Sequence, residues 1–276
     1  MVKTAALMIV ASGAAHAVVN AILKSGKDKM SSRALIDGFS AILVLPAAVF
    51  LPLPNGAWAW LAGSGITHLL YLICLVKAFE HGDMSTAYPI SRGTAPVLAA
   101  ISAVGLFGAP ISIAVVAGVL LVSLGTLMIA LKHRADRRSI AWAVATGCTI
   151  AAYTVIDSQG VRAAPNPFSY IAWVFLVLGG GIGLIFALWR GPTFILAARS
   201  QWKPGLAAGA LGIVTYGLAL WAYRLGDVPR LAALRETSIL FGVGIAVVFL
   251  KETVSRFRAL GAVTIAAGAI VLLASG

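Results

Sequence analysis

The chain has 276 residues, of which 60% are hydrophobic and only 11% are charged, and its mean hydropathy is +0.97. Soluble domains are about half apolar and about a quarter charged, so this composition excludes an ordinary soluble protein. A helix needs about 20 apolar residues to cross the hydrocarbon core of a bilayer, and the chain has length for about ten such spans. The composition predicts an all-α integral membrane protein without a separate soluble domain.

The formal net charge is +12, from 21 basic and 9 acidic residues. The basic residues form short clusters between apolar runs, unlike the single basic, aromatic-studded face of a nucleic-acid-binding protein. They therefore indicate control of membrane orientation, and no nucleic-acid partner is expected. The two cysteines, Cys74 and Cys148, lie within apolar runs without a partner spacing, so we expect neither a disulfide nor a metal site.

The N-terminal segment imitates a secretory signal peptide, because Lys3 and an apolar run precede the small residues of Ala15-His16-Ala17. The apolar pattern continues to Leu23, which makes the segment long enough to cross the membrane. We therefore interpret it as the first span.

Apolar stretches bounded by charges, prolines and glycines predict ten spans in all. They begin near Lys3, Ser31, Ala57, Met84, Ile111, Ser139, Phe168, Lys203, Val228 and Val254. The clearest of the short loops are residues 51–56, 132–138 and 165–167.

An internal repeat relates the two halves of the chain. When Gly82-Asp83 is placed over Gly226-Asp227, Ser91-Arg92-Gly93 falls over Arg235-Glu236-Thr237. The repeat predicts a first half at 1–131, a basic connecting loop at 132–138 and a second half at 139–276. Because each half has an odd number of spans, the second half enters the membrane inverted. The prediction is two five-helix inverted repeats around a central cavity, working by alternating access.

The basic residues of the loops predict the orientation. The loops after spans one, three, five, seven and nine carry fifteen Lys and Arg residues, and the opposite side carries four. The positive-inside rule then places both termini outside the cytoplasm. We expect a multi-pass protein of the bacterial inner membrane.

Polar side chains within the spans are the candidate functional residues, because they normally face the bundle interior or a water-filled cavity. On the first span, His16 and Asn20 lie one helical turn apart, in a stripe with Ser12 and Lys24. On the third span, His68 and Tyr71 share a face. Two interpretations stay open for both pairs: hydrogen bonding between helices, or the wall of a substrate cavity.

The fourth span contains Tyr88-Pro89-Ile90-Ser91-Arg92-Gly93-Thr94-Ala95-Pro96. Two prolines and a glycine around a charge predict a broken helix beside Arg92. The repeat places Glu236, next to Arg235, in the position that matches Arg92. One interpretation is a charge-neutral brace of the three side chains across the pseudo-axis. The other is that Arg92 or Arg235 binds a substrate carboxylate while Glu236 carries a proton or an amino group.

The second half offers further polar and aromatic candidates. Tyr153 and Asp157 follow Thr149 at intervals of four on the sixth span, and Asp157 is either an interfacial acid near the helix end or a cavity residue. Tyr216 and Trp221, on the eighth span, are typical of an interfacial belt or of a binding surface. Phosphate-binding, serine-hydrolase and metalloprotease motifs are absent, so we expect no ATP hydrolysis, no metal, no cofactor and no enzyme activity.

The chain resembles the ten-helix, EamA-type branch of the drug/metabolite transporter superfamily. The resemblance rests on His16-Ala17-x-x-Asn20-Ala21-x-x-Lys24, on Ala78-Phe79-Glu80-His81-Gly82-Asp83 followed by Tyr88-Pro89-x-x-Arg92-Gly93-x-x-Pro96, and on Leu250-Lys251-Glu252-Thr253. It implies secondary transport, usually export, of amino acids, other metabolites or amphiphilic compounds. It makes the following residues candidates for the cavity wall: His16, Asn20, His68, Tyr71, Tyr88, Arg92, Tyr153 and Glu236.

The chain departs from this family in two respects. Gly108-Ala109-Pro110 replaces the acidic and basic residues that commonly follow the fourth span. The charge bias also places the termini outside the cytoplasm, whereas many relatives are expected to have them inside.

Together these features predict an exporter of small metabolites, with amino acids favoured and aromatic ones included. Its partners would be a small-molecule substrate, the lipid bilayer and protons as the candidate coupling ion. One alternative is a facilitator that needs no ion gradient. The other is an integral-membrane enzyme acting on a lipid-linked substrate, which would require a catalytic cluster at one membrane face.

Overall fold

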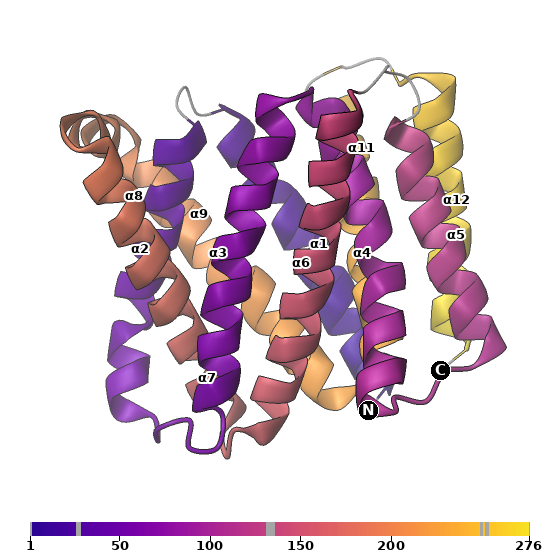
Figure 1. The fold of residues 1–276 in the computed structure, drawn as a ribbon, viewed down its shortest axis with the longest axis horizontal. Helices are drawn as coiled ribbons and strands as arrows, with labels where there is room; N and C mark the ends of the chain where they lie inside the picture. The colour runs from indigo at the N-terminus through magenta and orange to yellow at the C-terminus, as the bar shows by residue number, and fades with distance from the viewer. Residues whose placement is uncertain (1, 26–28, 131–135, 249–250, 252–253, 276) are drawn as a thin grey trace.

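The computed structural model describes residues 2–25, 29–130, 136–248, 251 and 254–275, and every regular element among them is helical (Figure 1). The elements are α1 (Val2–Ser25), α2 (Lys29–Phe50), α3 (Trp58–Glu80), α4 (Met84–Phe107), α5 (Ile113–Ala130), α6 (Arg137–Ala163), α7 (Pro167–Phe175), the π-helical η1 (Leu176–Ile182), α8 (Gly183–Arg190), α9 (Pro192–Leu225), α10 (Val228–Arg235), α11 (Ser238–Val248) and α12 (Arg256–Ala274).

These elements make ten spans, because α7, η1 and α8 form one continuous crossing and α10 with α11 forms another. In the described part of the chain, nine stretches are long and apolar enough to cross a bilayer, and Ile113–Ile129 is a shorter apolar helix. Large apolar side chains such as Ile42, Val49 and Ile113 are exposed on the outside. The predicted all-α membrane fold is confirmed. Arg137 and Arg138, predicted to lie in the connecting loop, belong to α6.

Both ends of the described chain lie at the same edge of the bundle, which we call the terminus edge (Figure 1). The C-terminal ends of α1, α5 and α11 lie at the opposite edge, which we call the basic edge. The predicted separation of basic and non-basic loops therefore corresponds to two faces of one molecule.

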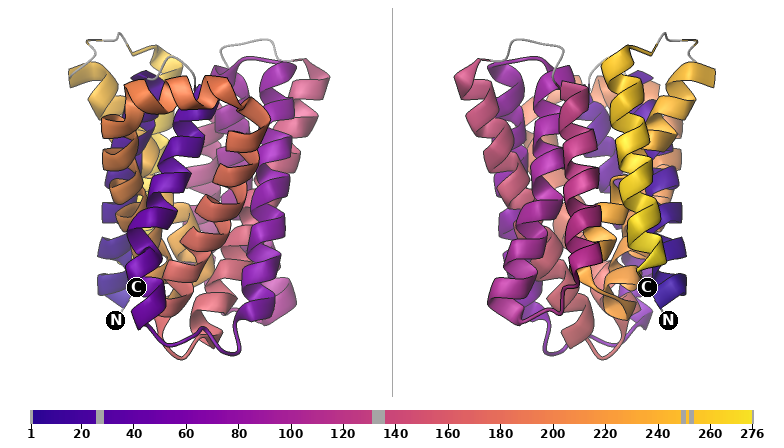
Figure 2. Two further views of the ribbon diagram at one scale, coloured as in Figure 1. Left: turned by 90° about the vertical axis from the view of Figure 1, so that its left-hand side faces the viewer. Right: turned by 90° about the vertical axis from the view of Figure 1, so that its right-hand side faces the viewer.

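The last helices of the two halves, α5 and α12, pack side by side at one end of the bundle (Figure 2). Gly125 faces Gly261, and Gly118 faces Gly268. A Cβ atom at Gly125 would lie 2.7 Å from the carbonyl oxygen of Gly261, and one at Gly261 would lie 2.6 Å from that of Gly125. In a bilayer the hydrophobic effect does not drive helices together, because lipid tails are as apolar as the side chains. Close approach of backbones at small residues is a typical way for helices to associate there.

The fourth span differs from the sequence prediction. α4 runs without a break from Met84 to Phe107, with Pro89 and Pro96 inside it. The break lies instead in the second half, between α10 and α11, at Glu236 and Thr237. There the Thr237 hydroxyl donates to the Leu234 carbonyl at 2.7 Å, so a side chain takes over a backbone acceptor.

Helix α1 packs closely against the backbone at this break between α10 and α11. A Cβ atom at Gly13 would lie 3.2 Å from the Ser238 nitrogen and 3.4 Å from the Arg235 carbonyl oxygen. The small residue on α1 thus lets the irregular backbone be covered by protein rather than by lipid, which non-helical backbone at membrane depth requires.

We expect Gly125→Val to destabilise the bundle by about 1–3 kcal/mol, because the new side chain overlaps the backbone of α12. Gly105→Val is the matched control, since no atom lies within 4 Å of a Cβ at Gly105. The measurement is the thermal unfolding midpoint of each purified variant in the same detergent. Equal midpoints for the two variants would contradict this account of the α5–α12 contact.

Candidate functional site

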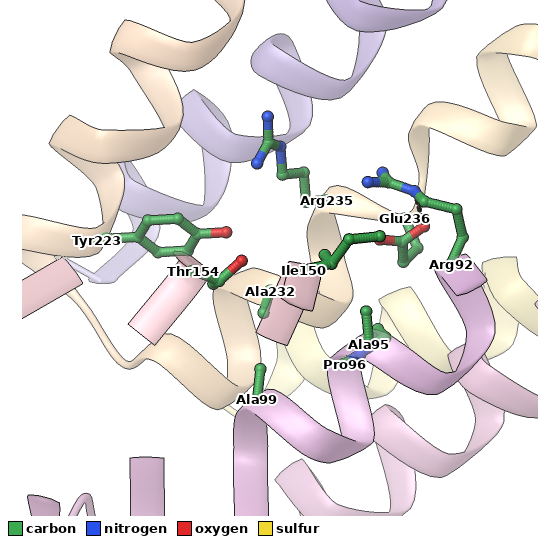
Figure 3. A pocket seen from close by; sticks show the side chains of 10 residues that line it. All are labelled: Arg92, Ala95, Pro96, Ala99, Ile150, Thr154, Tyr223, Ala232, Arg235 and Glu236. Carbon is green, nitrogen blue, oxygen red and sulfur yellow. Dashed lines mark ion pairs between the residues drawn. The ribbon is translucent and has the colours of Figure 1, made fainter. Parts of the chain in front are cut away.

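A buried ion pair joins the two halves in the middle of the bundle. Arg92 Nε, on α4, lies 3.0 Å from Glu236 Oε2, at the end of α10, and the two side chains are only 7% and 4% exposed. Figure 3 shows the two side chains meeting across the interior. The ion pair predicted from the repeat is therefore present. A pair of this kind lowers the cost of a charge in an apolar bundle.

Arg235 adds a second buried cation next to this pair. Its guanidinium carbon lies 5.1 Å from the centre of the Tyr216 ring, and its side chain interacts electrostatically with Tyr223. We call Arg92, Arg235 and Glu236 the charged layer. Two cations and one carboxylate give this layer an excess of one positive charge. Four atoms of the layer have no hydrogen-bond partner among the described residues: Arg92 Nε and Glu236 Oε2, which face each other in the ion pair, and Arg92 Nη2 and Arg235 Nε.

A small cavity of about 10 Å³, room for roughly one water molecule, adjoins the charged layer. Figure 3 shows its lining residues, which are Arg92, Ala95, Pro96, Ala99, Ile150, Thr154, Tyr223, Ala232, Arg235 and Glu236. Most of the lining side chains are small or apolar, and the charges gather at one end. In this conformation the cavity is closed around the charges, so a molecule larger than water could enter only if the helices around it moved apart.

Aromatic side chains form a second group of contacts beside the layer. His68 stacks on Tyr153 with ring centres 4.0 Å apart, and Tyr71 meets Tyr153 edge-on at 5.8 Å. His68 Nδ1 lies 3.0 Å from the carbonyl oxygen of Ser64. Because a carbonyl can only accept, this contact calls for a proton on Nδ1, and in the neutral form of the ring Nε2 would then be the acceptor.

Asp157 is fully buried and its two oxygens accept hydrogen bonds from two tyrosines. The Tyr170 hydroxyl donates to Oδ1 at 2.8 Å, and the Tyr216 hydroxyl donates to Oδ2. Asp157 therefore faces the interior of the bundle, where the tyrosines come from α7 and α9. Tyr216 links Asp157 to the charged layer, because its ring contacts Arg235.

The other predicted residues lie at different distances from the charged layer. His16 and Tyr88 are half-buried, and both interact electrostatically with Arg92. Trp221 lies apart and meets Phe168 edge-on, with ring centres 4.3 Å apart. Asn20 is half-buried on α1, and Ser12 of the same stripe donates to the Thr215 carbonyl of α9 at 2.6 Å.

Sequence reasoning missed a second charged pair, Arg33 and Asp37. Arg33 Nε lies 2.8 Å from Asp37 Oδ2, and the Arg33 side chain is 46% exposed. Arg33 lies on the opposite side of α2 from the exposed Ile42 and Val49, so it faces the bundle rather than lipid. It interacts electrostatically with Tyr71 and Tyr153.

The signal for this pair was present in the sequence, because Arg33 and Asp37 are one helical turn apart at the start of an apolar run. Arg33 had been counted among the loop cations. Tyr170 was also missed, and its only signal was that a buried tyrosine hydroxyl needs a partner.

We expect Arg92→Leu alone to destabilise the protein by up to about 3–5 kcal/mol, because Glu236 loses the cation that lies 3.0 Å from its carboxylate and keeps only the neighbouring Arg235. The double variant Arg92→Leu/Glu236→Leu should recover part of that loss, since neither member of the pair remains. Thermal unfolding of the wild type, both single variants and the double variant measures the coupling. Additive losses would show that the two side chains act independently.

The comparisons with known proteins agree with this architecture. A solved crystal structure of a protein that is 18% identical in sequence matches 98% of this chain and 95% of its own, with a TM-score of 0.73, and so shares the fold. No curated protein matches the chain in sequence. The model of the EamA-like transporter family matches twice, at residues 3–131 and 137–274. Together these two matches cover nearly the whole chain, which is a member of the EamA-like transporter family.

Proposed function

We propose that this chain is a secondary transporter that exports small metabolites bearing a carboxylate, with amino acids favoured and aromatic ones among them. The observation that carries the proposal is the charged layer, with its excess positive charge and its two unpartnered guanidinium nitrogens. A buried charge without a partner is costly, and a bound carboxylate would neutralise it and accept the free hydrogen bonds.

The surroundings of the layer support a substrate of this kind. The adjoining pocket is lined by small residues, and the stacked rings of His68 and Tyr153 offer a flat apolar surface. We propose that substrate contacts come from the charged layer and from the side chains around it. The full set is His16, Asn20, His68, Tyr71, Tyr88, Arg92, Tyr153, Asp157, Tyr216, Trp221, Arg235 and Glu236, to which the structure leads us to add Arg33 and Asp37.

Alternating access of two inverted halves, at 1–131 and 139–276, would carry the substrate across. His16, His68 and Glu236 are the candidates for coupling protons, because all three are ionisable and lie at or beside the layer. The alternative of a facilitator predicts transport that ignores a pH gradient. The alternative of an enzyme is disfavoured, because the described ionisable cluster lies deep in the bundle rather than at a membrane face.

We expect Arg235→Gln to abolish saturable uptake of amino acids into proteoliposomes, or to raise the KM by at least about tenfold, because a charge-assisted hydrogen bond to the carboxylate is lost. Arg235 is a cleaner target than Arg92, since its removal leaves no carboxylate unpaired. Arg230→Gln is the matched control: Arg230 is also buried on α10, but it donates to the Ser275 carbonyl at 2.8 Å.

Uptake is measured for labelled amino acids with and without an imposed pH gradient. Dependence on the gradient separates a coupled exporter from a facilitator. Equal uptake by wild type and Arg235→Gln would contradict the proposal that Arg235 binds the substrate carboxylate. Absence of uptake for every amino acid tested would contradict the proposal that amino acids are the substrates.

For the bacterial inner membrane we propose that both termini lie outside the cytoplasm, because fifteen of the loop cations lie on the other side. A reporter active only in the periplasm, fused after Gly276, should be active, and a cytoplasmic reporter at the same place should not. An active cytoplasmic reporter together with an inactive periplasmic one would show that the termini lie in the cytoplasm.

A further inference from the structure

Two arginines at the terminus edge tie the ends of α6 and α9 together. Arg162, in the last turn of α6, reaches across to the end of α9. Its Nε and Nη2 atoms donate to the Tyr223 carbonyl at 3.0 and 2.7 Å, and Nη2 also donates to the Gly226 carbonyl at 2.7 Å.

Arg224 makes the reciprocal contact from the last turn of α9. Its Nη1 atom donates to the carbonyls of Val161 and Ala164, at the end of α6. The last carbonyls of a helix have no partner within that helix, and the C-terminal end of the helix dipole favours a cation. Each helix therefore satisfies the open carbonyls of the other. We call Arg162, Arg224 and their four acceptor carbonyls the arginine clamp.

The clamp lies next to the pocket, on its terminus side. Tyr223 belongs to both: its side chain lines the pocket, and its carbonyl accepts from Arg162. Arg162 itself is exposed, so the clamp lies at the protein surface. Breaking the clamp and separating the two helix ends would open a path from the terminus edge toward the charged layer.

The repeat counterparts of these helices behave differently at the other edge. In span order, α6 corresponds to α1 and α9 to α3, and the last turn of α3 carries Lys77. Lys77 donates to Glu80 of its own helix at 2.7 Å. Within the described residues, α1 and α3 make at most marginal contact, whereas α6 and α9 pack together. The two halves thus differ in whether their first and third spans are joined.

We propose that the arginine clamp is the latch that holds the pocket closed toward the terminus edge, and that it opens when the transporter exposes its site to that side. The inference rests on the alternating access proposed above. Its components are five hydrogen bonds from charged donors. Removing these hydrogen bonds destabilises the state that is closed toward the terminus edge. The variants therefore shift the equilibrium toward the state that is open on that side.

The test is thiol labelling at Thr154→Cys, a buried pocket position, with Cys74→Ser and Cys148→Ser as background. A membrane-impermeant maleimide is added to sealed vesicles that expose a tag placed after Gly276. We expect Arg162→Gln/Arg224→Gln to raise the labelling rate from this side by about tenfold or more. Arg224→Gln alone should give a smaller rise, because the three bonds of Arg162 remain.

Lys77→Gln is the matched control, a basic residue in the last turn of the repeat-related α3, and it should not raise labelling from this side. Thermal unfolding identifies variants that are misfolded, and if the double variant is misfolded the single variant decides. An unchanged labelling rate in a folded clamp variant would overturn the proposal. The assay needs no substrate, so a failure to transport amino acids and a failure of the clamp are separate results.

Discussion

Placing charge in the centre of an apolar bundle is the constraint on which the interior of this protein depends. A lone arginine or glutamate there would be expensive, and the pairing of Arg92 with Glu236 reduces that cost. The partners come from opposite halves of the chain, so the ion pair also fixes how the halves meet. Arg235 has no carboxylate of its own in the layer, and a buried charge that costs stability in this way is expected where function needs it.

The scaffold around this layer is held by contacts that carry no charge. The α5–α12 contact brings backbones together at glycines, and the exposed apolar side chains face lipid. The ends of α6 and α9 are joined in a third way, by arginines on open carbonyls. The protein thus uses close packing at its periphery, charge pairing at its centre and charge-assisted hydrogen bonds at its terminus edge.

The spans, the repeat and the Arg92–Glu236 pair could be predicted from the sequence, because apolar length and repeated position leave a direct signal. The break in the fourth span was predicted wrongly. Pro89 and Pro96 are accommodated within a continuous α4, while Thr237 and the close approach of Gly13 place the break in the ninth span. Tyr170 and the pair of Arg33 and Asp37 were missed, since their roles depend on which helices become neighbours. The substrate role of each site residue stays a prediction.

The excess positive charge of the layer lies within the membrane, where it also feels the transmembrane voltage. Carrying one elementary charge across the whole potential changes the free energy by about 2.3 kcal/mol per 100 mV. If Arg235 moves along the membrane normal when the empty protein changes state, the voltage favours one of the two states. A substrate with a net negative charge would cancel that charge, whereas a zwitterionic amino acid would leave it in place. Only for an anionic substrate would the potential act on the empty carrier and not on the loaded one, which would make the return step the electrogenic half of the cycle.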